Sequence, residues 1–183
     1  MIATAQPTLN DDQLLAEKVG KGDHAAFNAI FERHRARIYR FCRLMLGSEA
    51  AAADIYQEVF IRFYRACREG RQMHNVRGYL VTVARTRCLN ALREMKRTMP
   101  IDEERQMGYE IDETAADTST HLQEALMSIA PQYREAFLLF EVEGYSYEEI
   151  SGQLGVSHDV VKNRIYRAKQ SLQKILGPLL GSY

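Results

Sequence analysis

The sequence predicts an all-α protein in which two small helical domains are joined by a flexible acidic linker. Apolar residues recur at three- and four-residue steps through most of the first hundred residues and again after residue 120, with almost no strand-like alternation. Between residues 98 and 119 this periodicity stops, and the segment is acidic and contains Pro and Gly. We therefore expect a short tail at 1–9, a first domain at 10–97, a linker at 98–119 and a second domain at 120–183.

Charge separates the same segments. The 183 residues carry no net charge, but residues 10–97 hold 17 basic and 10 acidic residues, and residues 98–119 hold 1 basic and 7 acidic residues. Residues 120–183 are nearly neutral, with 6 basic and 7 acidic residues. This segregation indicates a basic domain, an acidic connector and a near-neutral domain.

Membrane proteins, metalloproteins and enzymes are disfavoured. No stretch approaches the roughly 18 to 20 apolar residues that span a bilayer, and the N-terminus lacks the pattern of a secretory signal, so we expect a cytoplasmic chain without membrane insertion. Cys42, Cys67 and Cys88 form no CxxC pair, which predicts buried free thiols. Without a Gly-rich phosphate loop, a metal-ligand cluster or a nucleophile–base pair, we expect no enzymatic activity, catalytic residue, metal or cofactor.

Four helices are expected in the first domain. A short helix ends near Gly20, and Asp23 then caps a second helix, which Gly47 closes. The third helix spans about residues 54–67 and the fourth about residues 76–97. Helical spacing predicts these core positions in the third and fourth helices: Ile55, Val59, Phe60, Phe63, Leu80, Val83, Ala84 and Leu92.

Four more helices are expected in the second domain. They resume near His121, and Pro131 marks the first turn of the next helix, which stops at Gly144. The last two helices lie in residues 145–176, the strongest local pattern in the chain.

Residues 145–176 have the pattern of a helix-turn-helix. Ser146 and Glu149 have the S-x-x-E spacing of a capping box, Gly155 breaks the first helix, and Ser157 starts the second. The apolar stripe of the second helix comprises Val161, Ile165, Ala168, Leu172 and Ile175. Its opposite face is polar and basic, as in a recognition helix that enters the DNA major groove. A helical hairpin with a merely solvated charged face is the alternative.

The same helix resembles region 4 of the extracytoplasmic-function sigma factors, group IV of the sigma-70 family. The pattern S-x-G-T-V-K-S-R-x-x-R-A is matched at Ser157, Val161, Lys162, Arg164, Arg167 and Ala168. The chain departs from this pattern at Asp159, Val160 and Asn163, which bears on the DNA sequence preference. The resemblance implies that these residues bind the −35 promoter element: Ser157, Asp159, Lys162, Asn163, Arg164, Tyr166 and Arg167.

The third helix resembles region 2.2 of the same family. The pattern A-E-D-x-x-Q-E-x-F is matched at Ala52, Asp54, Gln57, Glu58 and Phe60, with Ala53 in place of the usual Glu. Asp54, Gln57 and Glu58 lie three and four residues apart and therefore share one helix face. Charged helix faces are often only solvated, but the resemblance implies that Asp54, Gln57, Glu58 and Phe60 bind the β′ clamp of core RNA polymerase.

The fourth helix resembles the segment of these sigma factors that melts the promoter and reads the −10 element. The pattern W-L-x-x-I-A-R-N is matched at Tyr79, Leu80, Val83, Ala84 and Arg85, with Tyr in place of Trp and Thr86 in place of Asn. The polar loop at 68–75 suits an unstacked base, although a plain polar connector is the alternative. The −10 DNA-binding residues implied are Arg71, His74, Asn75, Tyr79, Arg85, Arg93, Lys96 and Arg97.

The net charge of the second domain distinguishes two possible functions, an autonomous helix-turn-helix regulator and a sigma factor. An autonomous helix-turn-helix regulator needs a basic surplus, because phosphate neutralisation supplies much of its affinity, whereas residues 120–183 total −1. A sigma factor tolerates weak binding because polymerase holds both domains near their promoter elements. A purely structural helical protein would leave two basic helical surfaces unexplained. The resemblance implies as partners core RNA polymerase, through its β′ clamp and β flap, promoter DNA and a cognate anti-sigma factor.

Overall fold

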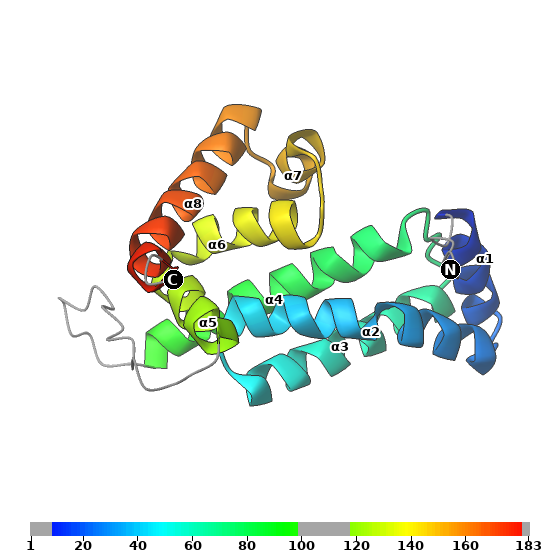
Figure 1. The fold of residues 1–183 in the computed structure, drawn as a ribbon. Coiled ribbons are helices and arrows are strands. Elements are labelled where there is room, and N and C mark those ends of the chain that lie inside the picture. Colours follow the sequence, from blue (N-terminus) through cyan, green and yellow to red (C-terminus); the bar gives the residue numbers. More distant parts are fainter. Residues whose placement is uncertain (1–8, 99–117, 181–183) are drawn as a thin grey trace, which may run out of the picture. The chain divides into compact units, whose positions relative to one another are not determined.

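The computed structural model describes residues 9–98 and 118–180, and all regular elements within these ranges are helical. In chain order the helices are α1 (Leu9–Gly20), α2 (His24–Leu46), α3 (Glu49–Arg68), α4 (Val76–Thr98), α5 (Thr118–Ser128), α6 (Pro131–Phe137), the π-helix η1 (Leu138–Val142), α7 (Tyr147–Leu154) and α8 (His158–Leu180) (Figure 1). The predicted all-α fold is confirmed for the described part of the chain.

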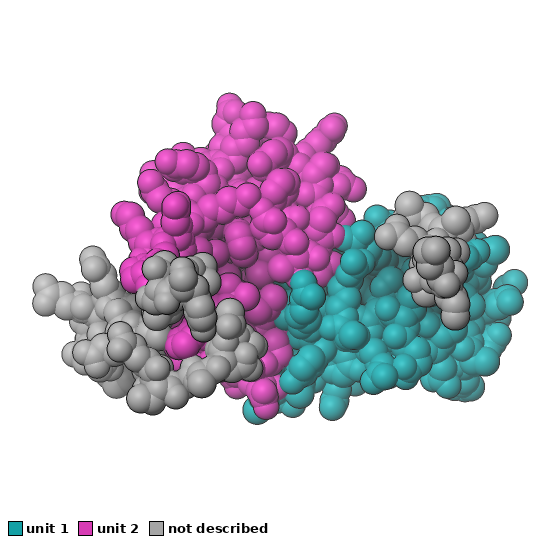
Figure 2. Space-filling view, in the orientation of Figure 1, with its two compact units in different colours: residues 1–42, 50–87 teal, residues 43–49, 88–183 magenta. Residues whose placement is uncertain are grey.

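The chain forms two compact units, each defined by contacts among its own residues (Figure 2). Unit 1 comprises residues 1–42 and 50–87, and unit 2 comprises residues 43–49 and 88–183. The last turn of α2 and the second half of α4 thus belong to unit 2. The predicted domain boundaries stay a prediction, and nearly all of the predicted tail and linker lies outside the described residues.

Helix starts in unit 1 follow the local capping chemistry. The Asp23 carboxylate accepts hydrogen bonds from the backbone N–H groups of Ala25 at 2.9 Å and Ala26 at 3.1 Å, as the sequence predicted for the cap of α2. Helix α3 begins at Glu49, five residues before the predicted start. The run of alanines that precedes Asp54 explains the difference, because alanine has the highest helix propensity.

The core of unit 1 is apolar. The predicted inward positions of α3 are buried, with Val59 and Phe63 fully enclosed. In α4, Leu80 and Ala84 are buried as predicted, but Val83 and Leu92 are only half-buried. The other buried positions of α4 are Val76, Val81 and Cys88. The prediction failed at Val83 because the buried face of α4 runs through Leu80, Val81 and Ala84, and Val83 lies at the edge of that face.

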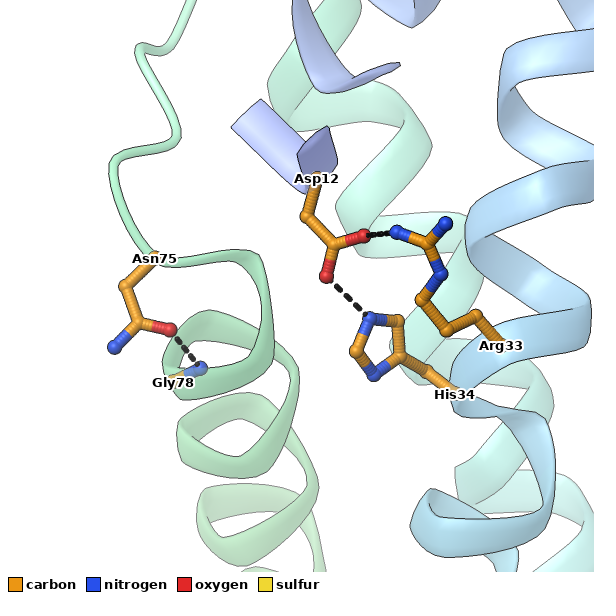
Figure 3. A network of polar contacts seen from close by, with 5 residues as sticks. All are labelled: Asp12, Arg33, His34, Asn75 and Gly78. Atoms are coloured by element: carbon orange, nitrogen blue, oxygen red, sulfur yellow. Dashed lines mark hydrogen bonds and ion pairs between the residues drawn. The ribbon is translucent and has the colours of Figure 1, made fainter. Parts of the chain in front are cut away.

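A polar cluster joins α1 to α2 inside unit 1 (Figure 3). The Asp12 carboxylate accepts a hydrogen bond from Arg33 and lies 2.8 Å from the Nε2 atom of His34. Asp12 and His34 are 8% and 6% exposed, whereas Arg33 covers them from the exposed side. At the other end of α1, the Arg68 guanidinium donates to the Gly20 carbonyl at 3.0 Å. Polar contacts therefore fix both ends of α1.

In unit 2, α8 packs against α5, α6 and α7. The buried Arg134 guanidinium donates at 3.0 Å to the carbonyls of Met127 and Ile129, and it also donates to the carbonyl of Met45. These carbonyls lie at helix ends or just beyond them, where backbone acceptors lack partners within the helix. The buried arginine therefore holds the ends of α5 and α2.

All three cysteines are buried and free, as the sequence predicted. Cys42 and Cys88 are fully enclosed, and Cys67 is 3% exposed. Burial raises the pKa of the Cys67 thiol to about 11. Because the reactive form of cysteine is the thiolate, the environment of Cys67 suppresses its reactivity.

Candidate nucleic-acid interface

The polar face of α3 presents two of the four residues predicted to bind polymerase. Asp54 and Gln57 are exposed, and Glu58 is half-buried. Phe60 is 3% exposed, and its ring lies 4.9 Å from that of Phe31 and 5.5 Å from that of Tyr56. Its position therefore makes it part of the support beneath the helix, separate from the exposed face.

Glu58 is held by two arginines. One carboxylate oxygen accepts a hydrogen bond from Arg62 at 2.8 Å, and the other accepts one from Arg87 of α4 at 2.7 Å. Burial alone would raise the pKa of Glu58, but the two arginines outweigh this effect and lower the pKa of the carboxyl below its ordinary value. Glu58 therefore links α3 to α4, a role that sequence spacing gave no means to predict.

The α3–α4 loop brings together two residues predicted to bind the −10 element. The Arg71 guanidinium carbon lies 5.1 Å from the centre of the Tyr79 ring. Burial raises the pKa of the Tyr79 hydroxyl, and the charge of Arg71 acts in the opposite direction. Arg71 is exposed and Tyr79 half-buried, so the pair offers a cation and an aromatic ring at the surface of unit 1.

The exposed Asn75 starts α4. Its side-chain oxygen accepts a hydrogen bond from the backbone N–H of Gly78 at 2.8 Å (Figure 3). A Cβ at Gly78 would lie 2.9 Å from the Asn75 side chain, so this cap fits closely against a glycine. Because the oxygen is engaged in the cap, only the NH2 group of the exposed Asn75 side chain lies outside this hydrogen bond. The neighbouring His74 is exposed.

A surface depression of about 320 Å³ adjoins this loop. Gln13, Glu17 and Lys21 line it from the α1 side, opposite Arg71 and Gln72 of the loop. Sequence reasoning missed the α1 side, because its approach to a loop about fifty residues further along depends on tertiary folding. Lys21 and Arg71 thus contribute two cations to the lining, together with the carboxylate of Glu17.

The basic residues predicted in α4 are accessible to different degrees. Arg85 is half-buried, whereas Arg93, Lys96 and Arg97 are exposed on the later turns. Arg87, which the prediction omitted, is bound to Glu58. The last turns of α4 therefore carry the accessible positive charge of this helix.

The helix-turn-helix has the predicted local chemistry. Ser146 accepts a hydrogen bond from the Glu149 N–H at 3.2 Å, and the Glu149 carboxylate accepts one from the Ser146 N–H at 2.8 Å. Gly155 has a φ of 63°, a left-handed conformation that glycine adopts without steric cost. The Ser157 hydroxyl lies 3.4 Å from the Val160 N–H at the start of α8. Capping box, glycine turn and second helix are all present.

The outer face of α8 is accessible as the helical projection predicted. Val161, Ile165, Ala168 and Leu172 are buried, and Arg164 is half-buried. The other residues predicted to bind the −35 element are exposed: Ser157, Asp159, Lys162, Asn163, Tyr166 and Arg167. Tyr166 is 64% exposed, the highest fraction among the large hydrophobic side chains of the described residues. The helix can thus present base-reading and phosphate-binding groups together.

Two basic side chains of α8 are restrained by neighbouring helices. The Arg167 guanidinium carbon lies 5.9 Å from the centre of the Tyr133 ring. Lys169 forms a 2.6 Å ion pair with Glu141 of η1. Sequence reasoning missed both partners, because Tyr133 and Glu141 each lie more than twenty residues before the basic residue that they contact.

No helix in the described ranges has the length and apolarity needed to cross a membrane. Within residues 9–98 and 118–180, no group of three or more His, Cys, Asp and Glu side chains could hold a metal ion. Each unit exposes polar and basic side chains on its helices.

Two family models match the chain. Sigma-70 region 2 matches residues 30–98, and Sigma-70, region 4, matches residues 119–172. The chain is 31% identical over 173 residues to the ECF RNA polymerase sigma factor SigM of Mycobacterium tuberculosis. The match covers 93% of this chain and 86% of that protein.

Solved structures share the fold. One is that of CnrH in complex with the cytosolic domain of CnrY, with a TM-score of 0.67, 20% identity, and coverage of 92% of this chain and 98% of CnrH. Another is the sigma factor RpoE in complex with the anti-sigma factor NepR from Bartonella quintana, with a TM-score of 0.65, 18% identity, and coverage of 82% and 96%. Together with the two matched regions, the sequence relationship shows that this chain belongs to the extracytoplasmic-function family of RNA polymerase sigma factors.

Proposed function

We propose that the chain binds core RNA polymerase and directs it to promoters that carry cognate −10 and −35 elements. Residues 10–97 bind core polymerase and read and melt the −10 element, and residues 120–183 place α8 in the major groove of the −35 element. The observation that carries this proposal is the exposed polar and basic face of α8. This helix follows α7, which starts with a capping box, and a turn at Gly155. The chain performs no catalysis itself, acts in the cytoplasm and needs no cofactor.

Three further contacts complete the proposal. The exposed Asp54 and Gln57 dock on the β′ clamp, and the second domain contacts the β flap. The acidic segment 98–119 enters a basic channel of polymerase, where its net charge of −6 is attracted. A cognate anti-sigma factor controls the free chain, as the similarity to a sigma factor solved with its anti-sigma factor supports.

One experiment distinguishes the proposed sigma-factor function from the alternative, an autonomous helix-turn-helix regulator. The chain and core polymerase are combined with fragments of the source genome, and transcripts that depend on the chain are sequenced. We expect specific initiation only when chain and core are both present. Tight sequence-specific duplex binding by the chain alone, unaffected by core, would support the autonomous regulator and overturn the proposal.

The docking face is tested by Asp54→Asn. We expect core binding to weaken about tenfold, because the variant removes an exposed charge from the proposed contact. Asp11→Asn removes one exposed charge from α1 and serves as the matched control. Glu58 is unsuited to this test, because its loss would also break the link to Arg87. Normal core binding by Asp54→Asn would show that the face is misassigned.

The −35 contact is tested by Arg167→Ala. A lost base or phosphate contact of about 1 to 3 kcal/mol predicts roughly 5- to 150-fold weaker initiation at promoters that depend on the −35 element. Lys174→Ala, which removes an exposed positive charge further along α8, is the control. Equal effects of the two variants would show that only overall charge matters.

A further inference from the structure

The ion pair between Glu141 and Lys169 joins an acidic residue outside the recognition helix to a basic residue within it. The Lys169 ammonium lies 2.6 Å from a Glu141 carboxylate oxygen and 5.3 Å from the centre of the Phe140 ring. The lysine side chain is 51% exposed and the glutamate side chain 39% exposed. The pair is therefore open to water and to a ligand that approaches α8.

Lys169 is exposed and lies at the edge of the α8 face that we propose enters the major groove. It follows Lys162 by seven residues, so the two lysines lie on the same flank of the helix. Tyr166, three residues before Lys169, belongs to the outer face. A lysine on the flank of a recognition helix is suited to neutralise backbone charge, since bases are read from the centre of that face.

The position of Glu141 is fixed by the elements around it. Glu141 belongs to the π-helix η1, whose Leu138 and Leu139 are buried in unit 2. The ring of the adjacent Phe140 stacks on that of Tyr147, with centroids 4.8 Å apart, and the Tyr147 and His158 rings form a T-shaped pair with centroids 5.4 Å apart. A row of rings thus connects η1, through α7, to the first turn of α8. Glu141 is held beside the recognition helix.

We propose that Glu141 limits the affinity of α8 for DNA in the absence of polymerase, by competing with phosphate for Lys169. The inference rests on the proposed DNA-binding role of α8 and adds a control on it. To contact phosphate, Lys169 must leave Glu141, and the uncompensated carboxylate then repels the DNA backbone. Non-specific binding, which depends almost entirely on phosphate neutralisation, is reduced most by such a competitor. Polymerase offsets this cost by holding α8 at the promoter.

The test uses the full chain without polymerase and a short DNA duplex of mixed sequence, with binding measured by fluorescence anisotropy over a series of salt concentrations. We expect Glu141→Gln to bind about three- to tenfold more tightly at low salt. We also expect the slope of log K against log salt to steepen by about 0.9, the value for one additional phosphate contact.

Two controls isolate the role of Lys169. Glu148→Gln removes another exposed acidic charge from unit 2, on α7, and should change affinity less than about twofold, as expected for one screened charge. In a Lys169→Gln background, Glu141→Gln should give no more gain than Glu148→Gln. Equal gains from Glu141→Gln and Glu148→Gln, or a full gain without Lys169, would overturn the inference.

Failure of this inference is distinguishable from failure of the proposed function. If the wild-type chain initiates transcription with core polymerase but Glu141→Gln binds DNA no more tightly than the wild type, only the role of Glu141 is wrong. If no promoter is used by the chain and core together, the proposed function itself fails.

Discussion

At Asp12, one buried carboxylate holds two side chains of α2, Arg33 and His34. Burial lowers the pKa of His34 below its ordinary value of 6.5, more than the hydrogen bond and charge of Asp12 raise it, and the charges of Arg33 and Arg37 act in the same direction as burial. The imidazole is therefore held in its neutral form at neutral pH. An additional positive charge at this position would destabilise the packing of α1 on α2.

The sign of the resulting pH dependence follows from proton binding. Below pH 6.5 the unfolded chain takes up a proton at His34 that the folded chain resists, so the contribution of His34 to the free energy of unfolding decreases as pH falls from 6.5 towards the lowered pKa. We expect the wild-type Tm to fall over this interval. In His34→Gln, which cannot titrate at this position, the fall should be smaller. Differential scanning calorimetry across pH measures both, and parallel curves would contradict the prediction.

Single positions show where sequence reasoning succeeds. The exposure of Asn163 and Tyr166 and the burial of Val161 follow from helical period alone, and the structure confirms them. The partners of Glu58 and Lys169 could not be predicted in this way. Arg87 and Glu141 lie more than twenty residues from them in sequence, and only tertiary packing brings these charges together.

Helix α7 depends on a capping box at its start. Ser146 and Glu149 each satisfy a backbone N–H at its start, and α7 is only eight residues long. Short helices are marginal in isolation, so the cap is a substantial part of the stability of this helix. The capping box therefore sets where the helix-turn-helix begins.

Replacing Ser146 tests the cap. Ser146→Ala removes the hydroxyl that accepts from the Glu149 N–H, and we expect the free energy of unfolding to fall by about 1 kcal/mol. Ser146→Asp retains an acceptor at the same position and should recover most of this loss. Urea denaturation of the two variants and the wild type measures the difference. Equal losses in Ala and Asp variants would show that the cap is not the cause.

Helix starts were easier to predict than the path of the helices between them. Asp23, Pro131 and Ser146 each mark a start that the structure confirms. By contrast, the change from α6 to the π-helix η1 has no signal in the apolar period. The burial of Arg134 was equally hidden, because it requires carbonyl acceptors from the ends of other helices.

For the whole chain, the segregation of charge is the property that most directly predicts behaviour. Residues 10–97 total +7 and residues 98–119 total −6, although the chain is neutral. In the proposed holoenzyme these segments meet different surfaces of polymerase and DNA. Association should therefore depend on salt through the separate charges of the segments rather than through the net charge.

Substitutions in the acidic segment 98–119 test whether its charge contributes to the binding of core polymerase. The triple variant Asp102→Asn, Glu103→Gln, Glu104→Gln removes three of its seven acidic charges. We expect weaker binding to core polymerase, by about three- to tenfold at low salt, because attraction to the basic channel is reduced. Arg105→Gln makes the segment more acidic and should have the opposite effect. Core affinity measured over a salt series checks both, and changes of the same sign would contradict the prediction.

The three buried cysteines make the chain a convenient subject for such measurements. Each thiol is enclosed in the fold, and burial suppresses the thiolate of Cys67. Maleimide dyes should therefore react slowly with the native chain, while a cysteine introduced at an exposed position would react quickly. A fluorophore at Gln170 on α8 would report the approach of DNA, and one at the exposed Ile61, one turn after Gln57 on α3, would report polymerase docking, without first replacing any native cysteine.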